Sequence, residues 1–257
     1  MLLNNRVLLV EDSDSDRFLF SRYLNQLGYE CDCFENGKEL IDKIDEYPSS
    51  LVLLDIELPV MNGIETALHV RKHCDHSERR FILIGLTSHD DPEMLDEIAS
   101  SGFDNCLHKP IRRRELEIKL KQYIKLNMNQ LHNNEDSASK KNEKGRVYSL
   151  DMFEADDPEF LQSIIGMFVA STPVAIVAMQ AAFDEKNWEL LRMHAHKLKP
   201  HFNYFMIAEG AAALQELEEY ARHVKELDKI PGLLHTIDRI GKLVLEQIKE
   251  DYPSISE

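Results

Sequence analysis

Five polar residues that could do chemistry stand at or just after the ends of short apolar runs in the first half of this 257-residue chain. They are Glu11, Asp12, Asp55, Thr87 and Lys109. Continuous apolar runs are typical of buried parallel strands. In an open parallel sheet, ligands bind beyond the carboxyl ends of the strands. We therefore expect these side chains to converge at one end of one sheet.

Converging carboxylates and an amine suggest phosphoryl chemistry. Three clustered carboxylates repel unless a cation neutralises them, and oxygen ligands without His or Cys favour Mg2+. The hydroxyl of Thr87 and the ammonium of Lys109 could then hold phosphoryl oxygens. Asp55 is the candidate nucleophile, which would form an aspartyl phosphate. The alternative, that each acid only caps a helix, suits Ser13 or Asp14 but not the whole set.

With these motifs, residues 4–126 resemble a response-regulator receiver domain, the phosphoryl acceptor of two-component signalling. The resemblance implies that Asp55 is the phosphorylation site and that Thr87 and Lys109 contact the phosphoryl oxygens. One position departs from the pattern. The family usually has Tyr or Phe three residues before the lysine, and this chain has Cys106 there.

The same resemblance implies a magnesium site. Asp12 and Asp55 would bind Mg2+ through their side chains, and Glu11 would act through water. The backbone carbonyl of Glu57 would complete the protein ligands.

The elements that must position these residues alternate in type. Short apolar strands alternate with helical patterns, which predicts a doubly wound parallel sheet of the α/β class with helices on both faces. The receiver resemblance makes this sheet flavodoxin-like. The expected helices lie near 14–27, 36–46, 63–74, 91–101 and 112–126.

The second half of the chain has a different pattern. Residues 127–147 are almost all polar and without period, which predicts a flexible linker. Residues 148–250 show no strand pattern, and several amphipathic helices with short connections predict an all-α antiparallel bundle. The expected helices cover 157–170, 172–185, 188–205, 208–223 and 231–250.

The third of these helices carries three histidines. On a helical wheel its apolar stripe predicts the core positions, which are Leu191, Ala195, Leu198, Phe202 and Phe205. A second stripe, Arg192, His196, Lys199 and Asn203, is expected on the solvated side. His194 and His201 lie on the other flank, nearer the apolar stripe. By itself, His196 beside two cations would be an ordinary surface histidine, although such cations could also offset the charge of an attached phosphoryl group.

The segment Ala195–Lys199 resembles the signature of histidine phosphotransfer (HPt) domains, and the resemblance extends over residues 148–250. It implies a helical bundle whose phospho-accepting histidine is His196, with Lys199 assisting. Two positions depart from the family pattern: Pro200 and Met206 stand where small residues, usually Gly, are found.

Composition narrows the function classes. The net charge is −16 and both halves are acidic, so neither half is suited to binding nucleic acid. We see no apolar run long enough to span a membrane and no signal peptide, and therefore expect a cytoplasmic protein. No glycine-rich nucleotide loop is present, which argues against an ATP-dependent kinase.

Cys31 and Cys33 share one face of a strand and are expected to be small buried hydrophobes.

The sequence therefore favours a phosphoryl carrier rather than an enzyme, namely a two-domain phosphorelay protein. It would accept a phosphoryl group on Asp55 and exchange phosphoryl through His196 with a receiver aspartate. Its partners would be a sensor histidine kinase, other receiver domains, or both. The alternative is an interaction module switched by phosphorylation, in which the bundle binds a partner and His196 is silent. A transcription factor is a third possibility.

Overall fold

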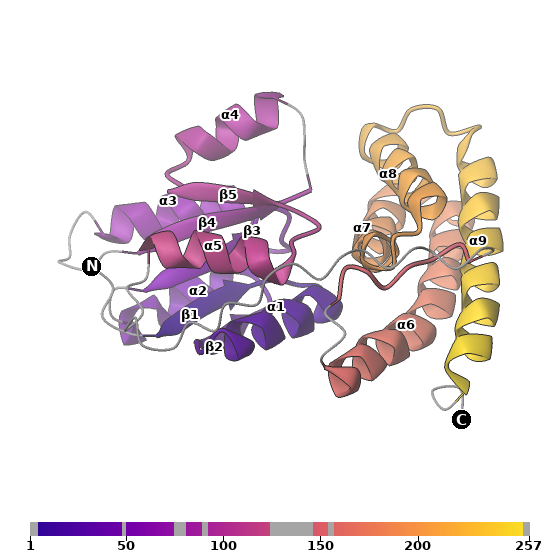
Figure 1. The fold of residues 1–257 in the computed structure, drawn as a ribbon. Helices are drawn as coiled ribbons and strands as arrows, with labels where there is room; N and C mark the ends of the chain where they lie inside the picture. The colour runs from indigo at the N-terminus through magenta and orange to yellow at the C-terminus, as the bar shows by residue number, and fades with distance from the viewer. Residues whose placement is uncertain are drawn as a thin grey trace. The chain divides into compact units, whose positions relative to one another are not determined.

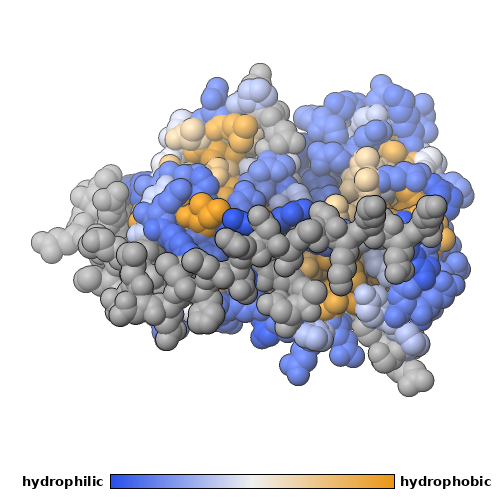
Figure 2. Space-filling model, in the orientation of Figure 1, coloured by the Kyte–Doolittle hydropathy of each residue, from blue (hydrophilic) through white to orange (hydrophobic). Residues whose placement is uncertain are grey.

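The computed structural model describes residues 5–47, 50–74, 81–88, 92–123, 146–153 and 157–253. The chain divides into two compact units, Met1–Glu135 and Asp136–Glu257. Most of the coloured side chains in Figure 2 are hydrophilic, with smaller hydrophobic groups among them.

The first unit is built on a parallel sheet with the strand order β2-β1-β3-β4-β5. The strands are β1 (Arg6–Val10), β2 (Glu30–Phe34), β3 (Leu51–Asp55), β4 (Ile82–Thr87) and β5 (Asn105–His108). The helices are α1 (Asp14–Gln26), α2 (Gly37–Lys43), α3 (Gly63–Cys74), α4 (Pro92–Ser100) and α5 (Arg113–Tyr123), with a 3-10 turn at Ile44–Glu46. They flank the sheet on both faces (Figure 1). The predicted doubly wound, flavodoxin-like fold is confirmed.

The central strands explain the apolar runs. Every residue of β3 and β4 is buried, because helices cover both faces of the sheet. The register pairs Val10 with Leu54 and Asp55 with Leu86. The carboxyl ends of β1, β3 and β4 therefore lie side by side, and this alignment positions the loops that follow them.

The described part of the second unit is helical, as predicted. Its helices are α6 (Pro158–Asp184), α7 (Trp188–Tyr204), α8 (Ala208–His223) and α9 (Ile230–Asp251). The core stripe predicted for α7 is buried. Two of its residues, Phe202 and Phe205, pack on Phe168 of α6, with 4.3 Å between the stacked ring centroids of Phe168 and Phe205. These contacts join α6 to α7.

The predicted break at Thr172-Pro173 is wrong, because α6 continues through Pro173. Thr172 is fully buried and Phe168 and Met179 are buried on either side of the proline, so packing outweighs the lost backbone hydrogen bond. The uninterrupted α6 also corrects the expectation about apolar runs. By length and composition it is long and apolar enough to cross a membrane, a test that core helices of soluble proteins also pass. In this fold α6 packs against α7 and α9.

The predicted linker, 127–147, lies outside the described residues except for its last two. Arg146 forms ion pairs with Glu250 and Asp251 at the end of α9. The amide of Val147 donates a hydrogen bond to Gln247 at 3.0 Å. These two residues are therefore attached to the bundle rather than free of it.

Candidate functional site

The first unit gathers carboxylates at the carboxyl ends of its strands. Glu11 and Asp12 follow β1, Asp55 ends β3, and ligand oxygens of all three lie within 4.8 Å of one another. Glu11 and Asp55 are buried. The cluster arises because adjacent parallel strands in register end together, so that loops distant in sequence meet.

The carboxylate of Asp55 is held at both oxygens. The amide of Glu57 donates to Oδ1 at 3.1 Å, and Nζ of Lys109 donates to Oδ2 at 2.8 Å. The turn behind it depends on Gly63, where a Cβ atom would lie 2.2 Å from the carbonyl oxygen of Asp55. Any side chain at Gly63 would push this loop away.

The ammonium of Lys109 also contacts an acid that the sequence analysis missed. Besides Asp55, Nζ of Lys109 lies 2.7 Å from Glu11 and 2.9 Å from Oδ2 of Asp16. Asp16 is fully buried in the first turn of α1. A signal was present in the sequence, since Asp16 continues the apolar stripe of Leu19 and Phe20 at helical spacing. A charged residue on such a stripe needs a buried partner.

The site has more negative charge than its lysine can offset. Burial raises the pKa of Glu11 well above its ordinary value, Asp55 and Asp16 raise it further by repulsion, and Lys109 opposes the shift. Carboxylate oxygens in excess of nearby cations are a donor set that suits a hard divalent cation. Glu11, Asp12 and Asp55 therefore fit Mg2+ chemically.

Thr87 and Lys109 are connected through the backbone. Thr87 ends β4 and is buried, and its carbonyl accepts a hydrogen bond from the amide of Lys109 at 2.7 Å. Cys106, which departs from the Tyr or Phe usual at this position of the resembled family, pairs with Gly85 on the neighbouring strand and is partly buried.

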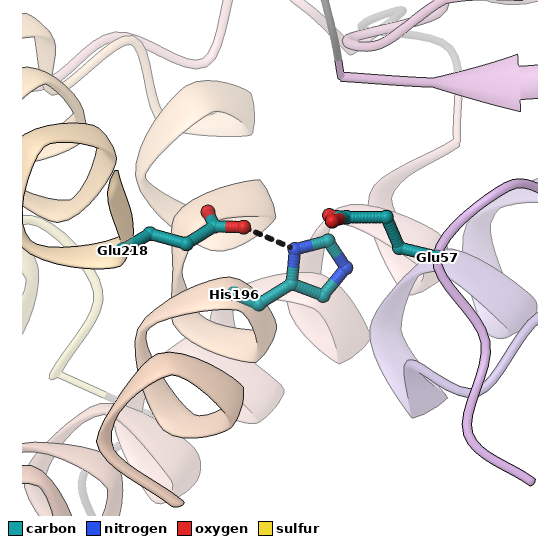
Figure 3. A group of neighbouring side chains, drawn as sticks. All are labelled: Glu57, His196 and Glu218. Carbon is teal, nitrogen blue, oxygen red and sulfur yellow. Dashed lines mark hydrogen bonds and ion pairs between the residues drawn. The ribbon is translucent and has the colours of Figure 1, made fainter. Parts of the chain in front are cut away.

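In the second unit, His196 is paired with a carboxylate from α8. Nδ1 of His196 lies 3.1 Å from Oε1 of Glu218, which is buried (Figure 3). An ionised carboxylate can only accept a hydrogen bond, so Nδ1 must carry the proton. The lone pair of a neutral ring is then on Nε2. This contact fixes both the tautomer and the orientation of the ring.

Lys199 is buried, which corrects the predicted solvated stripe. Its Nζ donates to Glu218 at 2.7 Å and to Gln215 at 2.8 Å. Arg222 forms a further ion pair with Glu218 at 3.2 Å. A helical wheel identifies one apolar face but does not reveal that α8 packs beside the polar stripe of α7. Glu218, with two cations and one imidazole, is the residue that the sequence analysis did not find.

The other two histidines of α7 are placed differently. His201 is buried, and its Nδ1 lies 3.0 Å from the hydroxyl of Ser171 on α6. His194 is partly exposed, and burial together with the charge of Lys197 lowers its pKa. His196 is also partly exposed, so the wheel separates it from His201 more clearly than from His194.

The two departures from the HPt pattern lie at the end of α7. Pro200 is buried inside a helix that continues to Tyr204. Met206 follows that helix with φ of 54° and is 46% exposed. This left-handed conformation favours glycine, which gives a backbone reason for a small residue at this position. Met206 adopts it with a bulky side chain facing solvent.

Residues 7–121 match the sequence profile of the response regulator receiver domain. Sensor histidine kinase GacS of Pseudomonas protegens is 25% identical over 247 residues, covering 92% of this chain and 26% of GacS. CAI-1 autoinducer sensor kinase/phosphatase CqsS of Vibrio cholerae is 30% identical over 119 residues, covering 46% and 17%. The chemotaxis protein CheY4 of Vibrio cholerae has a similar structure with 28% identity and a TM-score of 0.43, covering 48% of this chain and all of CheY4. The chain spans less than half the length of the curated relatives it matches.

Proposed function

We propose that the protein is a component of a phosphorelay, because residues 7–121 match the sequence profile of the response regulator receiver domain. It accepts a phosphoryl group on Asp55 and exchanges phosphoryl through His196 with a receiver aspartate. The observation that carries the proposal for Asp55 is its buried carboxylate, held by Lys109 beside Glu11. Its partners are then a sensor histidine kinase or other receiver domains, and its place of action is the cytoplasm.

At Asp55, the chemistry needs an oriented carboxylate and donors for the incoming phosphoryl oxygens. The hydrogen bond from the Glu57 amide orients Asp55, while an oxygen of Asp55 attacks phosphorus and the bond to the donor group breaks. Lys109, which pairs with Asp55, and Thr87 would contact the phosphoryl oxygens. Mg2+ bound by Glu11, Asp12 and Asp55 would neutralise part of the phosphoryl charge.

The affinity for Mg2+ should depend on the side chain of Asp12 but not on that of Glu57. Because Asp12 would bind Mg2+ with its side chain, Asp12→Ala is expected to weaken binding by about tenfold or more, equal to at least ~1.4 kcal/mol. Glu57 would contribute only its carbonyl, so Glu57→Ala should change the affinity less than about threefold. Calorimetric titration of the full chain with Mg2+ measures both. Asp14→Ala, whose side chain is 84% exposed, is the matched control. Equal losses at Asp12 and Glu57 would contradict these roles.

Asp16 is expected to restrain phosphorylation. Its carboxylate competes with the phosphoryl group for Lys109 and repels the phosphoryl charge. At saturating Mg2+, Asp16→Asn should therefore raise the steady-state phosphorylation of Asp55 by about fivefold or more, because one charge pair is worth about 1 kcal/mol even in a water-like dielectric. Labelling with acetyl phosphate checks this, with Asp14→Asn as the control on the same helix. Reduced labelling in Asp16→Asn would show that Asp16 supports Lys109 rather than competing for it.

The histidine half of the proposal is supported by the contact between His196 and Glu218. With Nδ1 protonated, Nε2 can attack phosphorus, and the reverse transfer returns the phosphoryl group to an aspartate. Lys199 and Arg222 together bring more positive charge to this position than Glu218 offsets. That charge balance favours a phosphoryl group on the ring.

Removing the charge of Glu218 tests its orienting role. Glu218→Gln is expected to slow phosphotransfer at His196 by about 10–100-fold, as for other groups that orient an imidazole. The tautomer of His196, read from its 15N chemical shifts, should also become mixed. The control is Glu219→Gln, because Glu219 is adjacent in sequence but about half exposed. A lower melting temperature with unchanged transfer rate and tautomer would make Glu218 only structural.

The experiment for the whole proposal uses the full chain and a phosphorylated receiver domain as donor. Transfer should produce a label that is acid-labile and base-stable on the chain, which identifies a phosphohistidine. The label on Asp55 is an acyl phosphate and is removed by base. A chain that labels at Asp55 but never at histidine, with any receiver or kinase offered, would instead support the phosphorylation-switched interaction module.

A further inference from the structure

Two thiols lie at the edge of the sheet, away from the chemistry described above. Cys31 and Cys33 are on β2, which pairs with β1 and is the first strand of the sheet. Cys33 is exposed and Cys31 is partly exposed. The expectation of two small buried hydrophobes is therefore wrong, because no element among the described residues covers this face of β2 enough to bury them.

The geometry brings the two sulfur atoms together. The Sγ atoms lie 3.7 Å apart, since residues two apart on a strand point to the same face. Their Cα atoms are about 6.6 Å apart in an extended strand, near the upper limit of about 6.8 Å for a disulfide. An edge strand with hydrogen bonds on one side only can pucker to shorten this distance. The sulfur atoms must also approach from 3.7 Å to about 2.0 Å, so closing the bond requires a local change in the backbone of β2.

Exposure and local interactions distinguish the two thiols, and both favour Cys33 as the nucleophile. A hydrogen bond from Cys31 lowers the pKa of Cys33 to about 7, and the charge of Arg17 on α1 contributes to this shift. Burial and Asp32 oppose it. The hydrogen bond to Cys33 raises the pKa of Cys31. A thiolate that is both exposed and stabilised in this way reacts faster than an ordinary cysteine.

We propose that Cys31 and Cys33 form a dithiol modification site that low-molecular-weight disulfides oxidise to an intramolecular disulfide. The thiolate of Cys33 attacks one sulfur of glutathione disulfide, and the S–S bond breaks to release one glutathione thiolate. Cys31 then loses its proton to solvent and attacks Sγ of Cys33, releasing the second glutathione. The two protein thiols lose two electrons and two protons in total, and glutathione disulfide gains both. Because the bond would be strained, it is reducible and suits a reversible modification.

Mass spectrometry of the full chain tests the site directly. Trypsin cleavage after Arg22 and Lys38 places Cys31 and Cys33 on one peptide without other cysteines. After treatment with glutathione disulfide, this peptide should lose the mass of two hydrogen atoms, and dithiothreitol should restore it. Cys31→Ser should trap a glutathione adduct on Cys33, because the serine hydroxyl can still donate to the thiolate but cannot resolve the adduct.

The reciprocal variant makes the assignment falsifiable. Cys33→Ser should form an adduct at Cys31 roughly tenfold more slowly, because Cys31 lacks the stabilised thiolate. Circular dichroism of both variants controls for folding. Equal adduct rates in the two variants would overturn the assignment of Cys33 as nucleophile. A wild-type peptide that keeps its mass, or that stops at the adduct, would overturn the disulfide itself.

Discussion

Asp55→Asn is expected to reduce acetyl-phosphate labelling of the first unit to background, a loss of about 100-fold or more, because an amide cannot serve as the nucleophile. The fold should persist. Asparagine can still accept the hydrogen bond from the Glu57 amide at its side-chain oxygen, and Lys109 keeps its ion pairs with Glu11 and Asp16. Removing one of the crowded carboxylates also relieves repulsion, so the melting temperature should stay level or rise.

The measurement uses base-labile label on the full chain at saturating Mg2+. Both the wild type and Asp55→Asn are measured in a chain that also carries His196→Gln, so that label on His196 does not contribute. Asp14→Asn should label as the wild type does, since Asp14 is exposed on α1. If Asp55→Asn accepts phosphate at the wild-type rate, Asp55 is not the site, and the acidic cluster would be only a metal-binding or structural feature.

The second large effect is expected at His196. His196→Gln should remove all acid-labile, base-stable label, again a loss of about 100-fold or more, because it deletes the nucleophile itself. Asp55 chemistry should be unaffected. His194→Gln is the matched control, since His194 is on the same helix and also partly exposed. His201 is less suitable because it is buried against Ser171.

The control distinguishes His196 from His194. Label that persists in His196→Gln and disappears in His194→Gln would contradict both the contact with Glu218 as the orienting feature and the resemblance to HPt domains. Melting temperatures of the two variants show whether a lost label reflects unfolding. Because the His196 ring contacts a buried carboxylate, a small shift is expected even for a folded variant.

The sequence by itself determined the sheet and the positions of Asp55, Thr87 and Lys109. Apolar runs identify buried parallel strands, and the residue that ends such a run must lie at the carboxyl edge of the sheet. Convergence of these residues follows from topology and needs no knowledge of side-chain packing. The same holds for the core stripe of α7, since a period of 3.6 residues defines one buried face.

The tertiary structure alone decided which polar residues touch. The contacts of Asp16 with Lys109 and of Glu218 with His196 and Lys199 join residues on different elements. No periodicity within one helix encodes which face a neighbouring helix will cover. Packing also decided the structure at Pro173. A proline usually ends a helix, but α6 continues through it among buried neighbours. It also left Cys33 exposed on an edge strand. Burial depends on how the elements pack together. The sequence pattern predicts it only for an element that buries one clearly apolar face.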